Sequence, residues 1–238
     1  MFPPSALRFG NVNTHRITLP TSVLDNFNPA TFAVWTQLNT LSQTAVRFFA
    51  KSGTGTHQFF PQDFGGGTYN LDCKRNRATT SCEVAALWTN FQGAAAGIPL
   101  FCVGQTDTGT SGNNKLFVGT QNIPVSEPSA YTLQTNGSGT VTSNASQACE
   151  IGNANGLNFS LQGVMWWIGI WNRLFNLNEL REMQYNPELF KSCSRGFWYP
   201  GKSGTSVVLD ESGRGFHGAV SGAVLSGLNL SFEEEFAL

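Results

Sequence analysis

The segment FSLQGVMWWIGIWNRLFNLNEL, residues 159–180, contains a run of large apolar residues that predicts a buried β-strand. Alternate side chains of a strand point to opposite faces of its sheet. In regular alternation, one face carries Met165, Trp167, Gly169 and Trp171, and the other carries Val164, Trp166, Ile168 and Ile170. A strand that is apolar on both faces must be covered on both. We therefore expect a sandwich core on one side and a loop, the following helix, a partner subunit or a ligand on the other.

A short helix is predicted directly after this strand. Asn176 is a favourable N-cap residue, and Glu179 stands three positions later, as in a capping box. We expect one short helix near residues 178–185 that ends before Pro187, because proline lacks the backbone N–H that a helix interior needs.

The composition predicts a single all-β domain over residues 1–238. The chain is long enough for a sizeable core, and only 12% of its residues are charged, about half the usual share. Its 26 glycines and 19 phenylalanines fit short strands joined by many turns. The net charge of −1 argues against a nucleic-acid-binding surface. The densest basic cluster, Lys74, Arg75 and Arg77, is interpreted as a solvated turn.

Two features of the chain bear on its location. No run approaches ~18 apolar residues, so we expect no membrane span, and the first five residues lack the basic and apolar regions of a signal peptide. The low charge and the abundance of small polar residues are nevertheless typical of extracellular proteins. A virion protein, made in the host cytoplasm and released by lysis, satisfies both observations. An extracellular fragment with an added Met1 is the alternative.

The five cysteines are Cys73, Cys82, Cys102, Cys149 and Cys193. An odd number cannot all pair within one chain, and no Cys/His cluster has the spacing of a zinc site. We expect reduced thiols, with a disulfide between Cys73 and Cys82 across a hairpin as the alternative. No metal and no cofactor are expected.

Six motifs in order resemble those of the laminin G-like (concanavalin A-like) jelly-roll family. They are residues 7–20 as the opening pair of strands, 31–35 (TFAVW), 49–53 (FAKSG), 115–119 (KLFVG), 150–153 (EIGN) and the closing segment 163–179. The resemblance covers most of the chain. It implies a two-sheet antiparallel jelly-roll sandwich, in a family that binds sugars or proteins or builds assemblies more often than it catalyses.

The chain departs from the family pattern in three places. Gly10 and Asn11 stand where acidic pairs are usual in relatives, so the calcium site of many relatives is not expected here. Trp166 and Trp167 replace commonly polar positions. The element at residues 210–220 usually precedes the first strand, but here it follows the last helix. We therefore expect residues 197–238 to form an arm that completes the sandwich or contacts a neighbouring subunit.

Catalysis has little support in the sequence. Glucanases of this fold class carry paired acidic residues on one strand, whereas Glu233, Glu234 and Glu235 are consecutive and stand near the C-terminus. His15, His57 and His217 lie far apart in sequence, and none belongs to a nucleophile motif. We expect no enzyme. His217 is predicted to support the turn at residues 210–218 through a backbone hydrogen bond.

The sequence favours a non-catalytic virion structural protein of bacteriophage type, either a capsid decoration protein or a tail or fibre accessory. It would act through contacts with other virion proteins and as a homo-oligomer, most simply a trimer. The alternative is a carbohydrate-binding, lectin-like module that recognises surface glycans. Candidate partner- or glycan-contacting residues are Trp88, Trp166, Trp198, Tyr199, Phe232 and Phe236. Predicted core residues are Trp35, Met165, Ile168, Ile170 and Trp171. The apolar tail at residues 228–238 is predicted to touch a neighbouring subunit.

Overall fold

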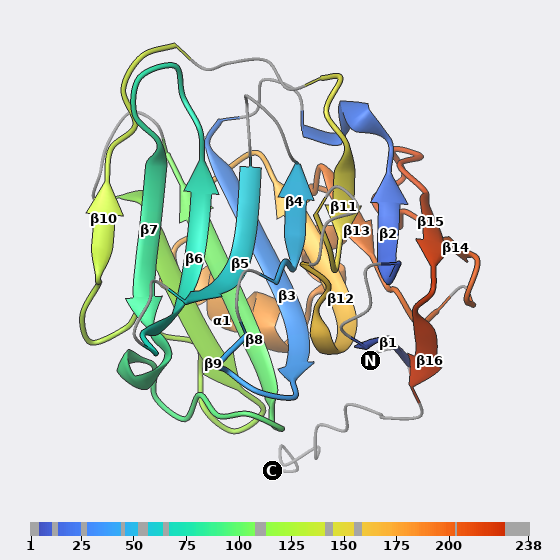
Figure 1. Cartoon of the computed structure of the whole chain (residues 1–238), viewed down its shortest axis with the longest axis horizontal. Coiled ribbons are helices and arrows are strands. Elements are labelled where there is room, and N and C mark those ends of the chain that lie inside the picture. The colour runs from blue at the N-terminus through green and yellow to red at the C-terminus, as the bar shows by residue number, and fades with distance from the viewer. Residues whose placement is uncertain are drawn as a thin grey trace.

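The protein is a sandwich of two antiparallel β-sheets (Figure 1). The computed structural model describes residues 5–10, 14–24, 28–43, 46–51, 57–63, 67–107, 113–140, 145–154, 159–202 and 204–226. None of the helices in these ranges combines the length and hydropathy needed to span a membrane. The all-β, two-sheet jelly-roll prediction is confirmed.

The seven-stranded sheet has the order β16-β1-β12-β3-β8-β9, and β13 also pairs with β12. Its strands are β1 (Ala6–Gly10), β3 (Ala30–Leu38), β8 (Pro99–Thr106), β9 (Lys115–Thr120), β12 (Gln162–Trp171), β13 (Gly196–Trp198) and β16 (Val224–Ser226). The nine-stranded sheet, which faces the viewer in Figure 1, has the order β10-β7-β6-β5-β4-β11-β2-β15-β14. Its strands are β2 (Arg16–Leu19), β4 (Phe49–Lys51), β5 (His57–Asp63), β6 (Tyr69–Arg75), β7 (Cys82–Leu87), β10 (Leu133–Thr135), β11 (Cys149–Ile151), β14 (Val207–Val208) and β15 (Gly218–Ser221).

Within the described ranges, helical structure is confined to short segments. The predicted helix is α1 (Leu177–Tyr185), and Asn176 and Glu179 form the expected capping box. A single further turn, α2 (Glu188–Lys191), follows it, and two 3₁₀ turns, η1 (Thr21–Leu24) and η2 (Trp88–Asn90), lie between strands. In Figure 1, α1 lies behind the seven-stranded sheet.

Strand β12 is buried on both faces, but its side chains do not alternate as predicted. A β-bulge lies between Met165 and Trp167, which pair with neighbouring residues Thr36 and Trp35 of β3. A bulge inserts one extra residue into a strand, so the faces exchange beyond it. Met165 therefore shares the inter-sheet core with Ile168 and Ile170. The second buried cluster, on the opposite face of the sheet, contains Val164, Trp166, Trp167 and Trp171.

The outer cover of β12 comes from the chain itself, through the helix and the C-terminal arm. Leu180 and Met183 of α1 and Phe197 and Tyr199 of the arm belong to the second buried cluster. The Trp167 and Phe197 rings stack with their centroids 5.2 Å apart. Trp35, a predicted core residue, is fully buried in this cluster rather than between the sheets. All five predicted core residues are buried.

The C-terminal arm adds strands to both sheets of its own sandwich. β15 pairs with β2 in the nine-stranded sheet, and β16 pairs with β1 in the seven-stranded sheet. The predicted backbone hydrogen bond of His217 is confirmed, because the Asp210 N–H donates to its Nδ1 at 3.0 Å. The tail that is predicted to touch a neighbouring subunit lies outside the described residues. It includes Phe232, Phe236 and the run Glu233 to Glu235.

The cysteines and the basic cluster give one confirmation and one correction. All five cysteines are free thiols, since the register places Cys73 opposite Val84 and Cys82 opposite Arg75. The prediction of a solvated basic turn is wrong for Arg75, which is only 1% exposed. It lies two residues beyond Cys73 and so shares the face of β6 that points between the sheets. Burial lowers the pKa of its guanidinium to about 10.

Candidate functional site

The aromatic residues predicted to contact a partner or a glycan are buried in the fold. Trp88, Trp166, Trp198 and Tyr199 each expose 3% or less of their surface. Trp88 and Trp198 pack between the sheets, and the Trp198 Nε1 donates to the Phe216 carbonyl at 2.8 Å. Trp166 and Tyr199 belong to the cluster outside β12. These four predictions are therefore corrected, because each ring fills a core position that no ligand reaches in this conformation. Phe232 and Phe236 lie outside the described residues.

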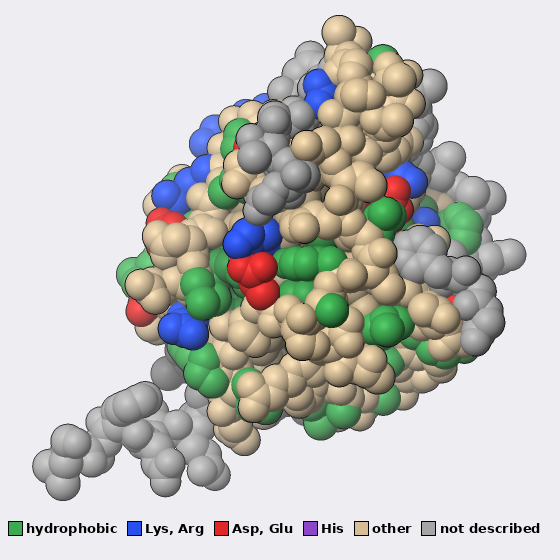
Figure 2. Space-filling model, turned by 90° about the vertical axis from the view of Figure 1, so that its left-hand side faces the viewer, with side chains coloured by type: hydrophobic (Ala, Val, Ile, Leu, Met, Phe, Trp, Pro, Cys, Tyr) green, Lys and Arg blue, Asp and Glu red, His purple; other side chains and the backbone are tan. Residues whose placement is uncertain are grey.

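A surface depression of about 470 Å³ lies between the β8–β9 hairpin and the start of α1. Its lining comes from the end of β8, the start of β9, the segment after β9 and the turn between β12 and α1. The lining residues are Gln105, Asn113, Lys115, Phe117, Glu127, Leu174, Phe175, Asn176, Leu177 and Glu179. Figure 2 shows the side of the molecule that contains the β9 and β10 edges. On this side, a positively charged and a negatively charged side chain lie next to each other, beside a hollow in which hydrophobic side chains are visible.

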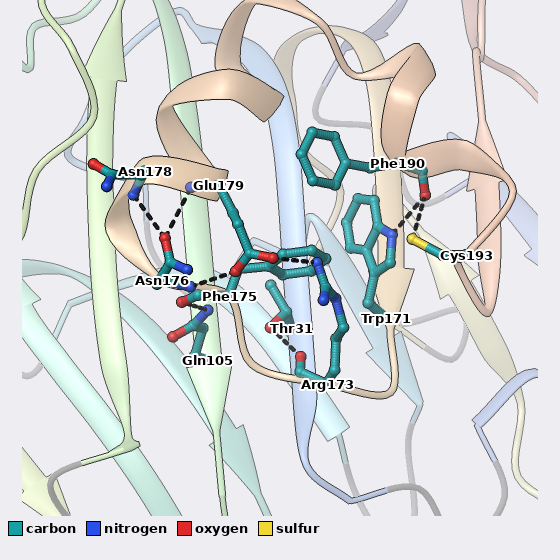
Figure 3. Close-up of polar contacts among 10 residues, drawn as sticks. All are labelled: Thr31, Gln105, Trp171, Arg173, Phe175, Asn176, Asn178, Glu179, Phe190 and Cys193. Atoms are coloured by element: carbon teal, nitrogen blue, oxygen red, sulfur yellow. Dashed lines mark hydrogen bonds and ion pairs between the residues drawn. The ribbon is translucent and has the colours of Figure 1, made fainter.

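The turn between β12 and α1 forms one wall of the depression (Figure 3). The Asn176 Oδ1 accepts from the backbone N–H groups of Asn178 and Glu179 at 3.0 Å. In return, Glu179 Oε2 accepts from the Asn176 N–H at 2.9 Å, and its Oε1 accepts from Arg173 Nη2 at 2.7 Å. The capping box is thus tied to the end of β12.

Two hydrogen bonds anchor this wall to the seven-stranded sheet. The Gln105 Nε2 donates to the Phe175 carbonyl at 3.0 Å, and the Thr31 Oγ1 donates to the Arg173 carbonyl at 2.6 Å. The Arg173 guanidinium lies 3.9 Å from the centroid of the Phe175 ring, in cation–π geometry. The wall is therefore preformed by the sheet beneath it.

An ion pair between β9 and the segment that follows it forms the opposite wall. Lys115 Nζ lies 2.7 Å from Glu127 Oε1, and both side chains are more than a third exposed. The Tyr131 hydroxyl donates to Glu127 Oε2 at 3.0 Å, which fixes the carboxylate from the far side. Burial, chiefly, and the nearby Glu127 charge raise the pKa of Tyr131, so the phenol remains a hydrogen-bond donor at neutral pH. At the rim, Asn113 Nδ2 donates to Asp107 Oδ2 at 2.8 Å.

The depression has a polar surface whose charges balance, over an apolar base. Phe117 and Phe175, which form this base, are each at least 96% buried. Each cation at the depression pairs with a carboxylate, Lys115 with Glu127 and Arg173 with Glu179. The amide of exposed Asn176 keeps its Nδ2 donors for a ligand, because only Oδ1 takes part in the cap. Within the described ranges no group of three or more His, Cys, Asp or Glu side chains could hold a metal.

The structure is similar to solved proteins of one architecture. A candidate carbohydrate-binding protein from Bacteroides ovatus matches with a TM-score of 0.61 and 15% identity, over 97% of this chain and 61% of that one. The fold is a concanavalin A-like jelly roll. Domain 4 of an extracellular arabinanase from Geobacillus stearothermophilus, in complex with arabinotriose, matches with a TM-score of 0.49 and 12% identity, over 74% of this chain and 80% of that one. Domains LG4-5 of the mouse laminin α1 chain match with a TM-score of 0.48 and 11% identity, over 75% and 44%.

The jelly roll supports the laminin G-like resemblance at the level of the fold. The quoted motifs lie on β1 and β2, β3, β4, β9, β11 and β12, as that resemblance implies. The chain spans about three fifths of the length of the Bacteroides ovatus protein. No protein-family model and no curated protein matches the chain.

Sequence reasoning missed the depression as a site. It treated residues 115–119 as a strand motif and Asn176 as a helix cap, and both assignments are correct. The only local signal is the antiparallel pairing of β8 with β9, which places Gln105 opposite Lys115. No feature of the sequence predicts that this hairpin lies next to residues 174–179, because that contact depends on how α1 folds back over the sheet.

Proposed function

We propose that this protein is a carbohydrate-binding module and that the depression between β9 and α1 is its glycan site. The observation that carries the proposal is the lining itself. Amides from Gln105, Asn113 and Asn176 and two fixed ion pairs surround a base formed by two phenylalanine side chains. A small number of placed polar groups around an apolar base is the usual composition of a ligand site.

The charge balance of the depression favours a neutral glycan. Because each cation already pairs with a carboxylate at 2.7 Å, an anionic sugar would have to break a pair to bind. Sugar hydroxyls donate and accept hydrogen bonds, so they can add to these groups without displacing them. The fold neighbour from Bacteroides ovatus, itself described as a candidate carbohydrate-binding protein, is compatible with this function.

Replacing Lys115 with methionine tests the site. We expect the affinity for a neutral oligosaccharide identified on a glycan array to fall about tenfold, because a hydrogen bond from a charged group contributes about 1.5–3 kcal/mol. Titration calorimetry measures the change. The thermal midpoint should move by less than about 2 °C, since an exposed pair contributes little stability.

Lys202→Met is the matched control for this measurement. Lys202 is an exposed lysine that pairs with Glu211 at 2.8 Å, in the C-terminal arm. The Lys202→Met variant should bind the oligosaccharide with the same affinity as the unmodified protein. The proposed site is wrong if both variants bind equally well, and the proposed function is wrong if no glycan on the array binds.

Assembly into a virion is the second candidate function, and one surface favours it. Val207 and Leu209 at β14 and Val224 and Leu225 in β16 are 41–51% exposed. We call these four residues the edge patch. Among the described strands, β14 and β16 end the two sheets, and Figure 1 shows both edges on the same side of the molecule. Exposed apolar edge strands can pair with another chain.

The double substitution Val224→Lys with Leu225→Lys tests assembly. If the edge patch joins subunits, light scattering after size exclusion should show an oligomer, most simply a trimer, and a monomer after substitution, because edge lysines oppose strand pairing. Leu189→Lys is the control, since Leu189 is 67% exposed but lies on α2. If the unmodified protein stays monomeric at high concentration, this candidate function is wrong.

A further inference from the structure

Asp72 is a buried carboxyl group on the outer face of the nine-stranded sheet. It lies in the middle of β6, and its neighbours Leu71 and Cys73 point into the inter-sheet core, so Asp72 points away from it. The residue is nevertheless 0% exposed. Neither carboxyl oxygen has a hydrogen-bond partner of suitable geometry in the structure. A buried carboxylate in this state would be strongly unfavourable.

The groups around Asp72 are of both signs. On β7, Ala85 is its direct partner in the register, and Glu83 is the diagonal neighbour on the same face. On β6, Lys74 lies two residues along and pairs with Glu83, with Lys74 Nζ 3.0 Å from Glu83 Oε2. The neighbour on β5 is the uncharged Phe60.

Arg47 is the remaining charged group near Asp72, but it makes no hydrogen bond to either Asp72 carboxyl oxygen. Its guanidinium lies over the Phe60 ring at 3.9 Å from the centroid, and it is only 8% exposed. Burial lowers the pKa of Arg47 to about 10, although the Asp72 charge acts in the opposite direction. The guanidinium therefore caps the Phe60 ring.

We propose that Asp72 and Glu83 hold one proton between them and that this proton is part of the folded structure. The acid form of Asp72 supplies an O–H donor, and a carboxyl oxygen of Glu83, whose other side pairs with Lys74, supplies the acceptor. Deprotonation would leave two negative carboxylates as diagonal neighbours on one face of the sheet. Burial first, and then the neighbouring Glu83, hold the pKa of Asp72 well above its usual range, which agrees with this arrangement.

The proposal makes the stability of the fold depend on pH in a definite direction. The folded state keeps a proton that the unfolded chain releases near pH 4. The stabilising contribution of this proton is therefore complete below pH 4 and is lost as the pH rises towards the folded pKa of Asp72. In the variant Asp72→Asn, the amide cannot ionise but keeps an N–H donor for Glu83. This variant should melt at the same temperature as the unmodified protein at pH 4 and at least about 10 °C higher at pH 8.

Two measurements on the full-length protein distinguish a proton held by Asp72 from a purely structural role of this residue. The ¹³C chemical shift of the Asp72 carboxyl should stay that of the acid from pH 4 to pH 7, and Glu83→Gln should move its titration to lower pH. Glu182→Gln, which changes an exposed carboxylate of α1, should leave both readouts unchanged. Titration of Asp72 near pH 4 would overturn the proposal. No effect of Glu83→Gln on that titration would overturn the shared proton.

Discussion

Replacing Gln184 with leucine is expected to destabilise the fold by about 3 kcal/mol, because it removes three hydrogen bonds and leaves the N–H of buried Val125 without this acceptor. Gln184 is 0% exposed and lies on the inner side of α1. Its Oε1 accepts from the Val125 N–H at 2.7 Å, and its Nε2 donates to the carbonyls of Thr120 and Ile123 at 2.6 and 2.9 Å. This one side chain therefore bonds the helix to the segment that follows β9.

Chemical denaturation measures this loss as a lower midpoint with an unchanged slope. Arg181→Leu is the matched control, since Arg181 is an exposed residue of the same helix. It introduces the same side chain without removing a buried partner, so its effect should stay within about 0.5 kcal/mol. Equal effects of the two substitutions would mean that leucine itself, rather than the lost hydrogen bonds, disturbs the helix.

Replacing Asp210 with alanine is expected to cost about 3–5 kcal/mol, because its buried carboxylate organises the C-terminal arm. Its Oδ1 accepts from the backbone N–H groups of Phe197 and Ser212 at 3.1 and 3.0 Å. Its Oδ2 accepts from Ser212 Oγ at 2.8 Å and from the Phe216 N–H at 3.0 Å. Alanine leaves all four donors without this acceptor at the junction of β13 with the β14–β15 turn.

Hydrogen exchange should locate the damage. We expect the amides of β15 and of β13 to lose protection first, because both strands adjoin the Asp210 turn. Glu211→Ala is the control, since Glu211 makes only surface pairs with Lys191 and Lys202 and should cost less than about 1 kcal/mol. A large loss of stability in both variants would mean that the surface ion pairs, rather than the Asp210 carboxylate, account for the effect.

Local chemistry by itself determined several parts of this protein. The capping box at Asn176 and the stop before Pro187 define α1, because both depend on groups within four residues of one another. The apolar run at residues 164–171 predicted a central strand covered on both faces, since a strand covered on one face alone would leave about half of its large side chains in water. The hydrogen bond of His217 within its own turn is likewise a local feature.

Tertiary structure decided what the local pattern could not. The bulge at Met165 and Trp167 exchanges the two faces of β12, because pairing with β3 over the whole strand outweighs regular alternation. Trp88, Trp166, Trp198 and Tyr199 are buried because segments distant in sequence close over them. The depression exists only where α1 folds back towards β9. Burial and long-range pairing are properties of the assembled sandwich, and composition or spacing cannot specify which of many aromatic side chains the assembly leaves at the surface.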